Sequence, residues 1–268
     1  MTFVDKLLAA SRKNESLLCV GLDPDPELMP GVSLIDFNKA IIDATADLVC
    51  AYKPNLAFYE ALGIDGIKAL HKTVEYVPRH IPVIGDGKRG DIGNTARAYA
   101  QALFEVFGFD AATVSPYLGF DSVEPFIKHE DKGVFLLCRT SNSGAVDFQS
   151  ILDIDGVPLY ERVARKAREW NVKGNIGLVV GATYPEELKQ VRKLCPEMPL
   201  LIPGIGAQGG DLAAAVEYGV NSKGEKAIIA VSRQVLYASQ SKDFAEGARR
   251  SAQELRDKIN GLVRRSAH

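Results

Sequence analysis

Alternating acidic and basic residues follow an apolar run in the stretch VIGDGKRGDIGNTARAYA, which covers residues 83–100. Four charged residues fall within a six-residue window there: Asp86, Lys88, Arg89 and Asp91. In an extended segment Asp86 and Lys88 are two residues apart and therefore face the same side. An acid and a base held within interaction range can transfer protons and stabilise developing charge. These residues therefore form either a reaction centre or a solvated loop.

Two more charged residues occupy similar places earlier in the chain. The apolar run LLCVGL is followed by Asp23, and the run CAYKPN contains Lys53 near its end. Charged loops are common in α/β proteins, so solvation explains each residue alone as readily as function does. Because both residues fall at the ends of predicted strands, as Asp86 and Lys88 do, we expect the four side chains to ring one opening.

The elements that must hold these side chains are eight short apolar runs bounded by turn residues. The runs cover residues 17–22, 50–55, 81–86, 111–116, 133–138, 175–180, 199–204 and 226–231. Stretches with an apolar stripe at helical spacing lie between them, at 36–49, 94–108, 158–171, 185–194 and 210–219. Continuous apolar strands are typical of parallel sheets covered on both faces. The pattern predicts an α/β fold, a single (β/α)₈ TIM barrel with an N-terminal helix, as one domain over residues 1–268.

The longest irregular stretch is RTSNSGAVDFQSILDIDG, residues 139–156. A loop of that length inside a compact domain is usually functional. Ser141 and Asn142 near its start can hydrogen-bond a polar ring edge, or they can simply cap the loop.

A glycine-rich segment, PGIGAQGGDLAAA, follows the seventh predicted strand. It places Gly204, Gly206 and Gly209 in the G-x-G-x-x-G spacing of dinucleotide-binding proteins. That fingerprint normally opens the first βαβ unit of a sheet, whereas only one strand remains here, so the context disfavours an NAD site. The glycines and the start of the next helix can instead approach a phosphate group. Arg233, after the eighth strand, is a bidentate phosphate donor, and barrels commonly bind phosphate at these two loops.

Composition narrows the classes of partner. The formal net charge is -2 with acids and bases interspersed, which gives no electrostatic case for nucleic acid or an anionic membrane. No apolar run reaches the roughly 18 residues of a membrane span, and the first residues lack the order of a signal peptide. The four cysteines form no Cys-x-x-Cys pair. We therefore expect a reduced, cytoplasmic protein without a zinc site.

Taken together, six motifs resemble the orotidine 5′-phosphate decarboxylase family, in particular its longer bacterial branch (type 2). They are LLCVGLDPDPELMP, AYKPNLAFYE, GDGKRGDIGNTARAYA, RTSNSGA, IPGIGAQGGD and VSRQVLYA. They occur in the family's order and span residues 17–238. The Asp-x-Lys-x-x-Asp-Ile motif that begins at Asp86 is the most specific of them.

The resemblance implies a lyase that converts orotidine 5′-monophosphate to uridine 5′-monophosphate, the last step of de novo pyrimidine biosynthesis, without a cofactor or metal ion. It also implies a catalytic Lys-Asp-Lys-Asp array made of Lys53, Asp86, Lys88 and Asp91. By the same resemblance Lys88 is the proton donor. Asp91 and Thr95 reach into the active site of a partner subunit, so the working unit is a homodimer.

The remaining substrate contacts are implied in the same way. Asp23 and Lys53 bind ribose hydroxyls, and Ser141 reads the pyrimidine edge. The phosphate group is assigned to Gln208 and Arg233, with Gly209 in the same loop.

The chain departs from the family pattern at two positions. Ser143 stands where the family often has proline, and Ser232 stands where it often has glycine. Neither residue belongs to the charged array, so the departures bear on loop geometry rather than on the reaction.

Three other functions fit parts of the sequence. A metal-dependent sugar-phosphate decarboxylase or aldolase on the same barrel shares the Asp-x-Lys-x-x-Asp spacing, but it needs a carboxylate where Lys53 stands to hold Mg²⁺. A catalytically silent phosphate-binding barrel has no use for two opposed lysines at an apolar strand end. An NAD-dependent oxidoreductase rests on the glycine spacing alone.

Overall fold

Short apolar runs form eight parallel strands in the computed structural model, which describes residues 1–206 and 209–266. The strands are β1 (Leu18–Leu22), β2 (Ala51–Pro54), β3 (Ile84–Arg89), β4 (Ala111–Val114), β5 (Gly133–Arg139), β6 (Ile176–Val180), β7 (Leu200–Ile202) and β8 (Ala227–Val231). Each overlaps one of the predicted runs, which confirms the predicted barrel. The third strand begins later than expected and continues to Arg89, so Asp86 lies inside the strand rather than at its end, and Lys88 lies inside it rather than after it.

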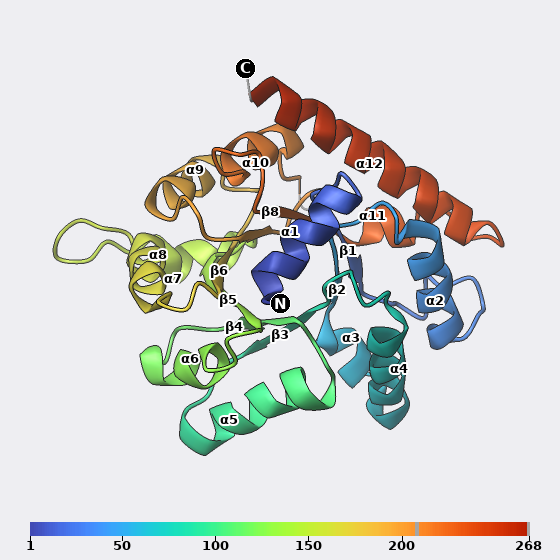
Figure 1. The fold of residues 1–268 in the computed structure, drawn as a ribbon, viewed down its shortest axis with the longest axis horizontal. Helices are drawn as coiled ribbons and strands as arrows, with labels where there is room; N and C mark the ends of the chain where they lie inside the picture. The colour runs from blue at the N-terminus through green and yellow to red at the C-terminus, as the bar shows by residue number, and fades with distance from the viewer. Residues whose placement is uncertain (207–208, 267–268) are drawn as a thin grey trace.

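The strands pair in the order β2-β1-β8-β7-β6-β5-β4-β3. Two isolated parallel bridges, Tyr52 with Val83 and Asn55 with Asp86, join the first and last strands of that order. The bridges bring β2 and β3 together and close the sheet into a barrel, around which the helices are arranged in Figure 1.

Helices connect the strands and cover the outside of the barrel. They are α1 (Phe3–Lys13), α2 (Leu34–Thr45), α3 (Leu56–Glu60), α4 (Gly63–Tyr76), α5 (Gly93–Gln101), α6 (Phe120–Ile127), α7 (Val146–Gln149), α8 (Leu159–Trp170), α9 (Pro185–Leu194), α10 (Leu212–Gly219), α11 (Arg233–Leu236) and α12 (Phe244–Ser266). A π-helical turn, Ala102–Val106, extends α5, and a 3₁₀ turn, Ser143–Ala145, precedes α7. The five stretches with helical spacing correspond to α2, α5, α8, α9 and α10, whereas α4 and α6 were not predicted from the sequence.

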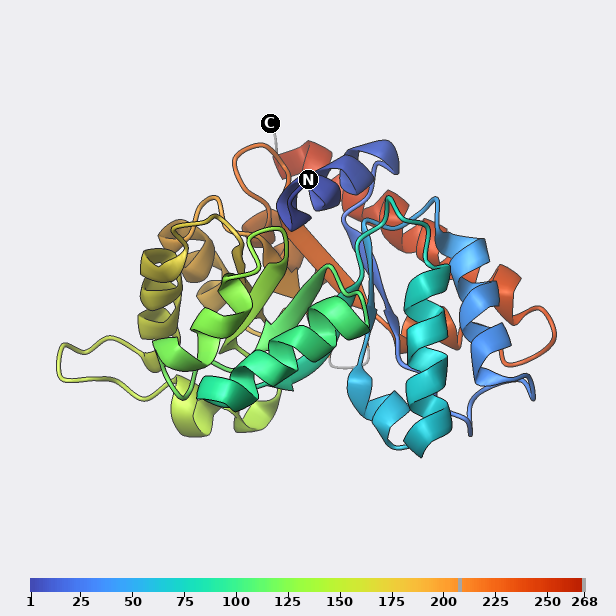
Figure 2. The same ribbon diagram turned by 60° about the horizontal axis from the view of Figure 1, so that its bottom comes forward.

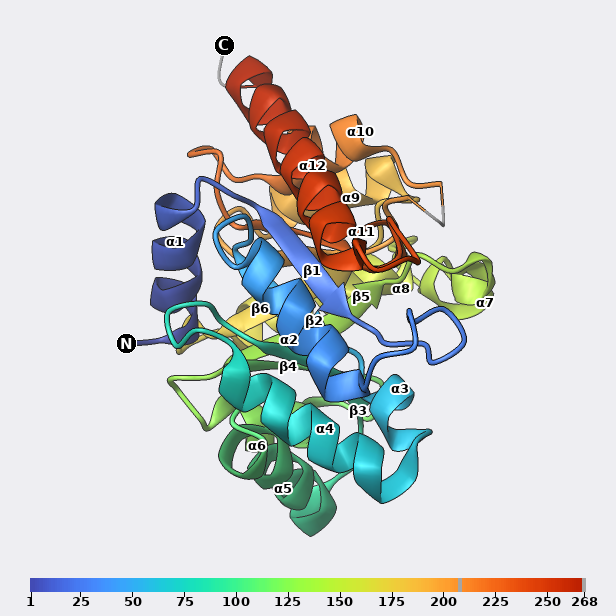
Figure 3. The ribbon, with the colours of Figure 1, turned by 90° about the vertical axis from the view of Figure 1, so that its right-hand side faces the viewer.

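The N-terminal helix plugs one end of the barrel. The Thr2 hydroxyl accepts a hydrogen bond from the Asp5 N–H, and the Asp5 carboxylate accepts one from the Thr2 N–H, so a capping box starts α1. Phe3 and Leu7 pack into the barrel interior, where the rings of Phe3 and Phe135 meet edge-on with centroids 5.6 Å apart. Figures 2 and 3 show α1 at the end opposite α7. Apolar side chains thus fill the amino-terminal end and leave the carboxyl ends of the strands open for a site.

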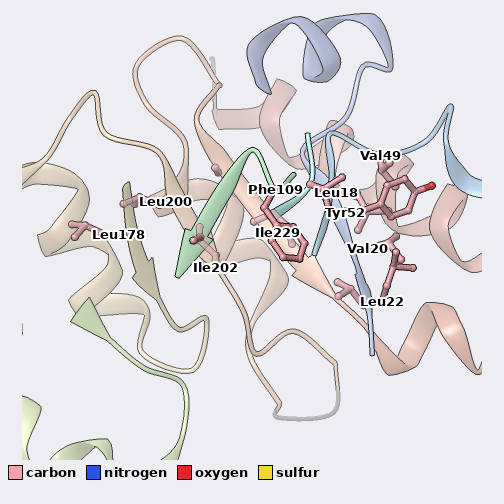
Figure 4. Close-up of a cluster of buried hydrophobic side chains, with 14 of the residues drawn as sticks. Leu18, Val20, Leu22, Val49, Tyr52, Phe109, Leu178, Leu200, Ile202 and Ile229 are labelled. Carbon is pink, nitrogen blue, oxygen red and sulfur yellow. The ribbon is translucent and has the colours of Figure 1, made fainter. Parts of the chain in front are cut away.

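Most strands bury side chains on both faces, as the continuous apolar runs predict; β3 is the exception, with glycines at its outward positions 85 and 87. On β1, Leu18 and Val20 pack outward against helices, while Cys19 between them points into the barrel. Figure 4 shows the outward set, which includes Leu200 and Ile202 of β7. Full burial of one such leucine contributes about 1.5–3 kcal/mol, so this layer is a main source of the barrel's stability.

Helix α12 closes the outer layer beside α2 and α10 (Figure 1). It buries Ala248, Ala252, Leu255 and Ile259 at intervals of three or four residues, and the rest of its surface is largely charged. No helix within the described residues is both long enough and apolar enough to cross a membrane.

The predicted long loop, residues 139–156, is partly ordered. It contains the 3₁₀ turn and α7, and a bridge between Leu152 and Pro158 closes a hairpin after them. The hairpin extends away from the barrel in Figures 1 and 2, and Ile154 in it is fully exposed. Only the first part of the loop lies near the open end of the barrel, beside the cavity described next.

Candidate active site

The carboxyl ends of the strands surround a cavity of about 770 Å³, a size suited to a small-molecule ligand. Every second residue of a strand faces inward, so the inward residues beyond the apolar plug line its floor. They are Gly21, Lys53, Asp86, Thr113, Leu137, Val179, Pro203 and Ala230. The residues from β2 to β4 make one side of this floor polar and charged, and those from β5, β6 and β8 make the other side apolar. The apolar side strengthens electrostatic interactions in the cavity because it excludes water.

A carboxylate between two lysines occupies the polar side. The Lys53 Nζ donates to Asp86 Oδ2 at 2.8 Å, and the Lys88 Nζ donates to Asp86 Oδ1 at 2.7 Å. Lys53 and Asp86 are buried, with exposed fractions of 7% and 8%, whereas the Lys88 side chain is half-exposed to the cavity. The structure therefore brings these three predicted residues together on one face.

Mutual attraction keeps the buried pair charged. Burial alone raises the pKa of a carboxyl group, but Lys53 and Lys88 outweigh burial and hold the pKa of Asp86 well below its usual range. Burial likewise lowers the pKa of an amine, yet Asp86 and then Asp23 outweigh it and raise the pKa of Lys53 above its usual value. The Lys53 ammonium and the Asp86 carboxylate are therefore both ionised near neutral pH.

We expect acid to weaken the fold through Asp86. An aspartate of the unfolded chain has a pKa of about 3.9, so the unfolded state takes up this proton at a higher pH than the folded state does. The contribution of Asp86 to the free energy of unfolding is then fully present above about pH 5 and is lost as the pH falls toward the folded-state pKa. Urea unfolding of wild type and Asp86→Asn should differ most at about pH 7 and less at about pH 3. A difference that stays constant over this range would contradict the depressed pKa.

Asp23 is held at the cavity wall by two hydrogen bonds. Its Oδ1 accepts from the Asn55 N–H at 3.1 Å, and its Oδ2 accepts from the Ser232 hydroxyl at 2.6 Å. A side chain at Gly21 would approach the Ser232 Cβ to 2.9 Å, so the glycine makes room for this contact. One of the two departures from the family pattern thus orients a predicted ligand-binding carboxylate. The other, Ser143, begins the 3₁₀ turn and is not among the described residues that line the cavity.

The segment after β5 forms another wall. Ser141 and Asn142 line the cavity, as predicted, together with Gln149 of α7. The Gln149 Oε1 accepts from the Thr140 N–H at 2.8 Å, and the Thr140 hydroxyl donates to Asn142 Oδ1 at 2.7 Å. A Cβ at Gly181 would lie 2.6 Å from the Ser141 Cα, so only glycine permits this close approach of β6. The wall is therefore fixed by contacts across the folded loop.

Glycines shape the end of the cavity near β7 and β8. Gly204, Gly206 and Gly209 have φ angles of 103°, 81° and 75°, a left-handed conformation that favours glycine. Gly204 and Arg233 line the cavity, whereas Gly209 is not among its described lining residues. Gln208 lies outside the described residues.

The start of helix α10 is capped by an acidic side chain. The Asp211 Oδ1 accepts from the N–H groups of Ala213 and Ala214 at 2.8 and 3.2 Å. A carboxylate thus already occupies the amino end of the helix and repels an anion. Phosphate binding near this helix start stays a prediction, and Arg233 and the backbone of the glycine segment are the other candidates.

Asp91 and Thr95 stand apart from the cavity of their own chain. Neither is among the described residues that line it. The Asp91 Oδ1 accepts from the Ile92 N–H at 2.8 Å, and Thr95 is exposed on α5. The single chain therefore brings Lys53, Asp86 and Lys88 together but not the fourth residue of the predicted array.

Potential metal ligands are sparse. In the described part of the chain, no group of three or more His, Cys, Asp or Glu residues is placed to hold a metal ion. All four cysteines are free and buried. Burial raises the pKa of Cys19, the cysteine beneath the charged array, to about 12, which keeps its thiol protonated. Lys53, placed between Asp23 and Asp86, also repels a cation from the two carboxylates.

Several polar residues that line the cavity were not predicted from the sequence, among them Thr113, Gln149 and Gln234. Thr113 carries a readable signal, because it is a polar residue in the apolar run AATVSP at an inward position two residues beyond Ala111. Gln149 carries none, since its contact with Thr140 depends on how the long loop folds.

The sequence and the fold of the chain were compared with those of known proteins, and the following matches are proteins of one family. The family model described as "Orotidine 5'-phosphate decarboxylase / HUMPS family" matches residues 16–248. The chain is 56% identical over 269 residues to "Orotidine 5'-phosphate decarboxylase" of Dehalococcoides mccartyi, which covers 99% of this chain and 100% of that protein. A protein of the same name from Herpetosiphon aurantiacus is 54% identical over 258 residues, with 94% and 95% covered. A solved structure of Leishmania donovani OMP decarboxylase matches with a TM-score of 0.89 and 42% identity over 98% of this chain and 99% of that one.

Proposed function

The chain belongs to the orotidine 5′-phosphate decarboxylase/HUMPS family, and from this premise we propose that it converts orotidine 5′-monophosphate to uridine 5′-monophosphate and CO₂, the last step of de novo pyrimidine biosynthesis. The observation that carries the proposal is the Lys53–Asp86–Lys88 array on the cavity floor, with Asp86 within 2.8 Å of both ammonium groups. A binding protein has no need to hold two lysines around one buried carboxylate. A reaction that develops negative charge beside these lysines does need such an arrangement.

The reaction follows from where the charge forms. The bond between the ring and its carboxylate breaks, CO₂ leaves, and the electron pair stays on the ring carbon next to nitrogen. That pair lies in the ring plane, where the π system cannot delocalise it. The Lys88 ammonium, hydrogen-bonded to Asp86 at 2.7 Å, stabilises the developing carbanion and then donates a proton from Nζ to that carbon. The resulting amine takes a proton back from water.

The other cavity residues bind and orient the nucleotide. Asp23, fixed by Asn55 and Ser232, accepts hydrogen bonds from ribose hydroxyls, and Lys53 donates to them. Ser141 contacts the pyrimidine edge. Arg233 binds the phosphate, together with the glycine segment that contains Gly209 and Gln208. Contacts remote from the reacting carbon supply binding energy for the chemical step.

No cofactor takes part in this proposal, because the array itself supplies the charge and the proton. The main alternative is a metal-dependent sugar-phosphate decarboxylase or aldolase, which Lys53 disfavours by repelling a cation between Asp23 and Asp86. The two are separated by adding purified protein to orotidine 5′-monophosphate in EDTA and following the loss of its absorbance. Turnover unaffected by EDTA supports the proposal. If the protein has no activity on orotidine 5′-monophosphate but has Mg²⁺-dependent activity on pentulose or hexulose phosphates, the sugar-phosphate enzyme would replace the proposed decarboxylase.

A homodimer is the second part of the proposal, with Asp91 and Thr95 contributed to the partner's active site. The segments after β3 and β4, which form the rim of the barrel near Asp91 and Thr95, expose large apolar side chains. Ile92 has an exposed fraction of 51% and Tyr117 one of 82%. The loop that carries Tyr117 is tied to β3, because the Ser115 N–H donates to the Arg89 carbonyl at 2.7 Å. An apolar rim of this kind supports association with a second copy.

Mixing two inactive variants tests this exchange of residues. We expect Asp91→Ala and Lys88→Ala each to be nearly inactive, and their co-refolded mixture to regain activity. Random pairing places an intact Lys88 beside an intact Asp91 at about a quarter of the sites in such a mixture of symmetric dimers. The number of binding sites is measured by titration with a tight-binding substrate analogue. The kcat per site of the mixture is then compared with that of wild type. A mixture no more active than its components would show that Asp91 acts within its own subunit or not at all.

We also propose that residues 1–268 form a single domain of this family and that the protein is cytoplasmic. One eight-stranded sheet that uses strands from Leu18 to Val231 supports the first statement. Four free, buried cysteines are compatible with the reducing compartment of the second.

A further inference from the structure

Thr113 is a buried polar residue in an otherwise apolar strand. It is 1% exposed on β4, and its side chain faces the cavity floor. Its hydroxyl makes two hydrogen bonds, with the Lys88 N–H at 2.9 Å and with the Asp86 Oδ1 at 3.0 Å. The Lys88 N–H can only donate and the charged carboxylate can only accept. The single proton of the hydroxyl therefore points at Asp86, while an oxygen lone pair accepts from Lys88.

This contact sits where the pairing of β3 and β4 breaks. Gly85 pairs with Ala112, and the next regular pair is Arg89 with Val114. Three residues of β3 therefore stand opposite Thr113 alone. In such a bulge, backbone groups lose their partners on the neighbouring strand, and a side chain must replace them.

Lys88 has an unusual backbone conformation at this bulge. Its φ angle is 45°, in the left-handed region that non-glycine residues rarely adopt. Such a conformation persists only where its surroundings hold it, and it often marks a functional position. The surroundings here are the Thr113 hydroxyl on the Lys88 N–H and the Asp86 carboxylate on the Lys88 Nζ.

We propose that Thr113 is a positioning residue for the reaction: its hydroxyl fixes the backbone of Lys88 and the carboxylate of Asp86 relative to each other. The inference rests on the proposed decarboxylase function. It assigns Thr113 no contact with the substrate, so Thr113 acts only through Lys88 and Asp86. Asp86 Oδ1 accepts hydrogen bonds from both the Lys88 ammonium and the Thr113 hydroxyl. The position of this oxygen, which Thr113 fixes, therefore also fixes the position of the Lys88 ammonium. Without the hydroxyl, the Lys88 N–H loses its acceptor and the bulge can relax.

Thr113→Val tests the proposal, because valine keeps the shape of threonine and removes the hydroxyl. We expect kcat to fall by about 10- to 100-fold, the range that a small misplacement of a reacting group produces. The KM and the affinity for uridine 5′-monophosphate should change little, since they depend on ribose and phosphate contacts elsewhere in the cavity. Thr113→Ser keeps the hydroxyl and should restore most of kcat.

A matched control separates positioning from general loss of stability. Thr45 on α2 is also fully buried, and its hydroxyl donates to the Ile41 carbonyl at 2.7 Å, away from the cavity. Thr45→Val should lower the thermal midpoint about as much as Thr113→Val and leave kcat unchanged. Equal kcat in Thr45→Val, Thr113→Val and wild type would overturn the inference, and so would a Thr113→Ser variant as slow as Thr113→Val.

A readout that does not depend on turnover completes the test. Amide hydrogen exchange at Lys88, resolved by NMR, should be slow in wild type and Thr113→Ser and faster in Thr113→Val. Unchanged exchange in Thr113→Val would overturn the inference even if kcat fell. If the wild-type protein does not act on orotidine 5′-monophosphate, the proposed function fails. If wild type is active and Thr113→Val matches it, only this inference fails.

Discussion

Lys88→Ala should lower kcat for orotidine 5′-monophosphate by about 10⁴-fold or more, because one group supplies both charge stabilisation and the proton. The side chain is half-exposed to the cavity, and its Nζ contacts Asp86 at 2.7 Å. Affinity for uridine 5′-monophosphate, measured by calorimetry, should stay within about threefold of wild type, since binding free energy lost only in the transition state appears in kcat.

A second lysine provides the control for this variant. Lys68 on α4 has a 66% exposed side chain and pairs with Asp65 at 3.2 Å on the same helix. Lys68→Ala should leave kcat unchanged, because an exposed pair of this kind has no connection to the cavity. If Lys88→Ala retained more than about one hundredth of wild-type kcat, proton donation by Lys88 would be contradicted.

Asp86→Asn should lower both stability and activity. Lys53 is buried and keeps its charge chiefly through Asp86, so neutralising the carboxylate leaves an uncompensated ammonium group on the cavity floor. Breaking a buried pair from one side costs about 3–5 kcal/mol in the free energy of unfolding. We expect a loss of that size in urea unfolding, and a fall in kcat of about 10³-fold or more as Lys88 loses its support.

Two further variants make this prediction decisive. Asp65→Asn removes a 92% exposed carboxylate from a surface pair, and it should change the free energy of unfolding by less than about 1 kcal/mol. The double variant Lys53→Met, Asp86→Asn removes the stranded charge, so it should regain stability without regaining activity. An Asp86→Asn variant as stable as wild type would show that the buried pair contributes little to folding. A double variant that regained activity would remove Asp86 from the mechanism.

The barrel and most of its site could be predicted from the sequence because their signals are local. The alternation of apolar strands and helices sets the fold, and Asp23, Lys53, Asp86 and Lys88 each follow or end an apolar run. In a barrel all such strand ends meet at one opening. The order of residues along the chain was therefore enough to predict that these side chains lie close together.

The parts that escaped prediction depend on contacts between distant segments. The bulge in β3 extends the strand to Arg89, and the contact that holds it comes from Thr113 on the neighbouring strand. The wall after β5 depends on Gln149 returning to Thr140 across a folded loop. Asp211 carries a local signal that was not used, because an aspartate directly before a helix is a common N-cap, and its carboxylate accepts from the Ala213 N–H.

Product analysis in heavy water tests whether the chain decarboxylates orotidine 5′-monophosphate with a proton that exchanges with solvent. Wild-type protein, orotidine 5′-monophosphate and EDTA are combined in D₂O, and the pyrimidine product is examined by proton NMR. We expect uridine 5′-monophosphate that carries one deuterium at the carbon that lost CO₂, because the Lys88 ammonium exchanges its protons with solvent before it donates one. Unchanged orotidine 5′-monophosphate under these conditions would show that the chain does not catalyse this decarboxylation.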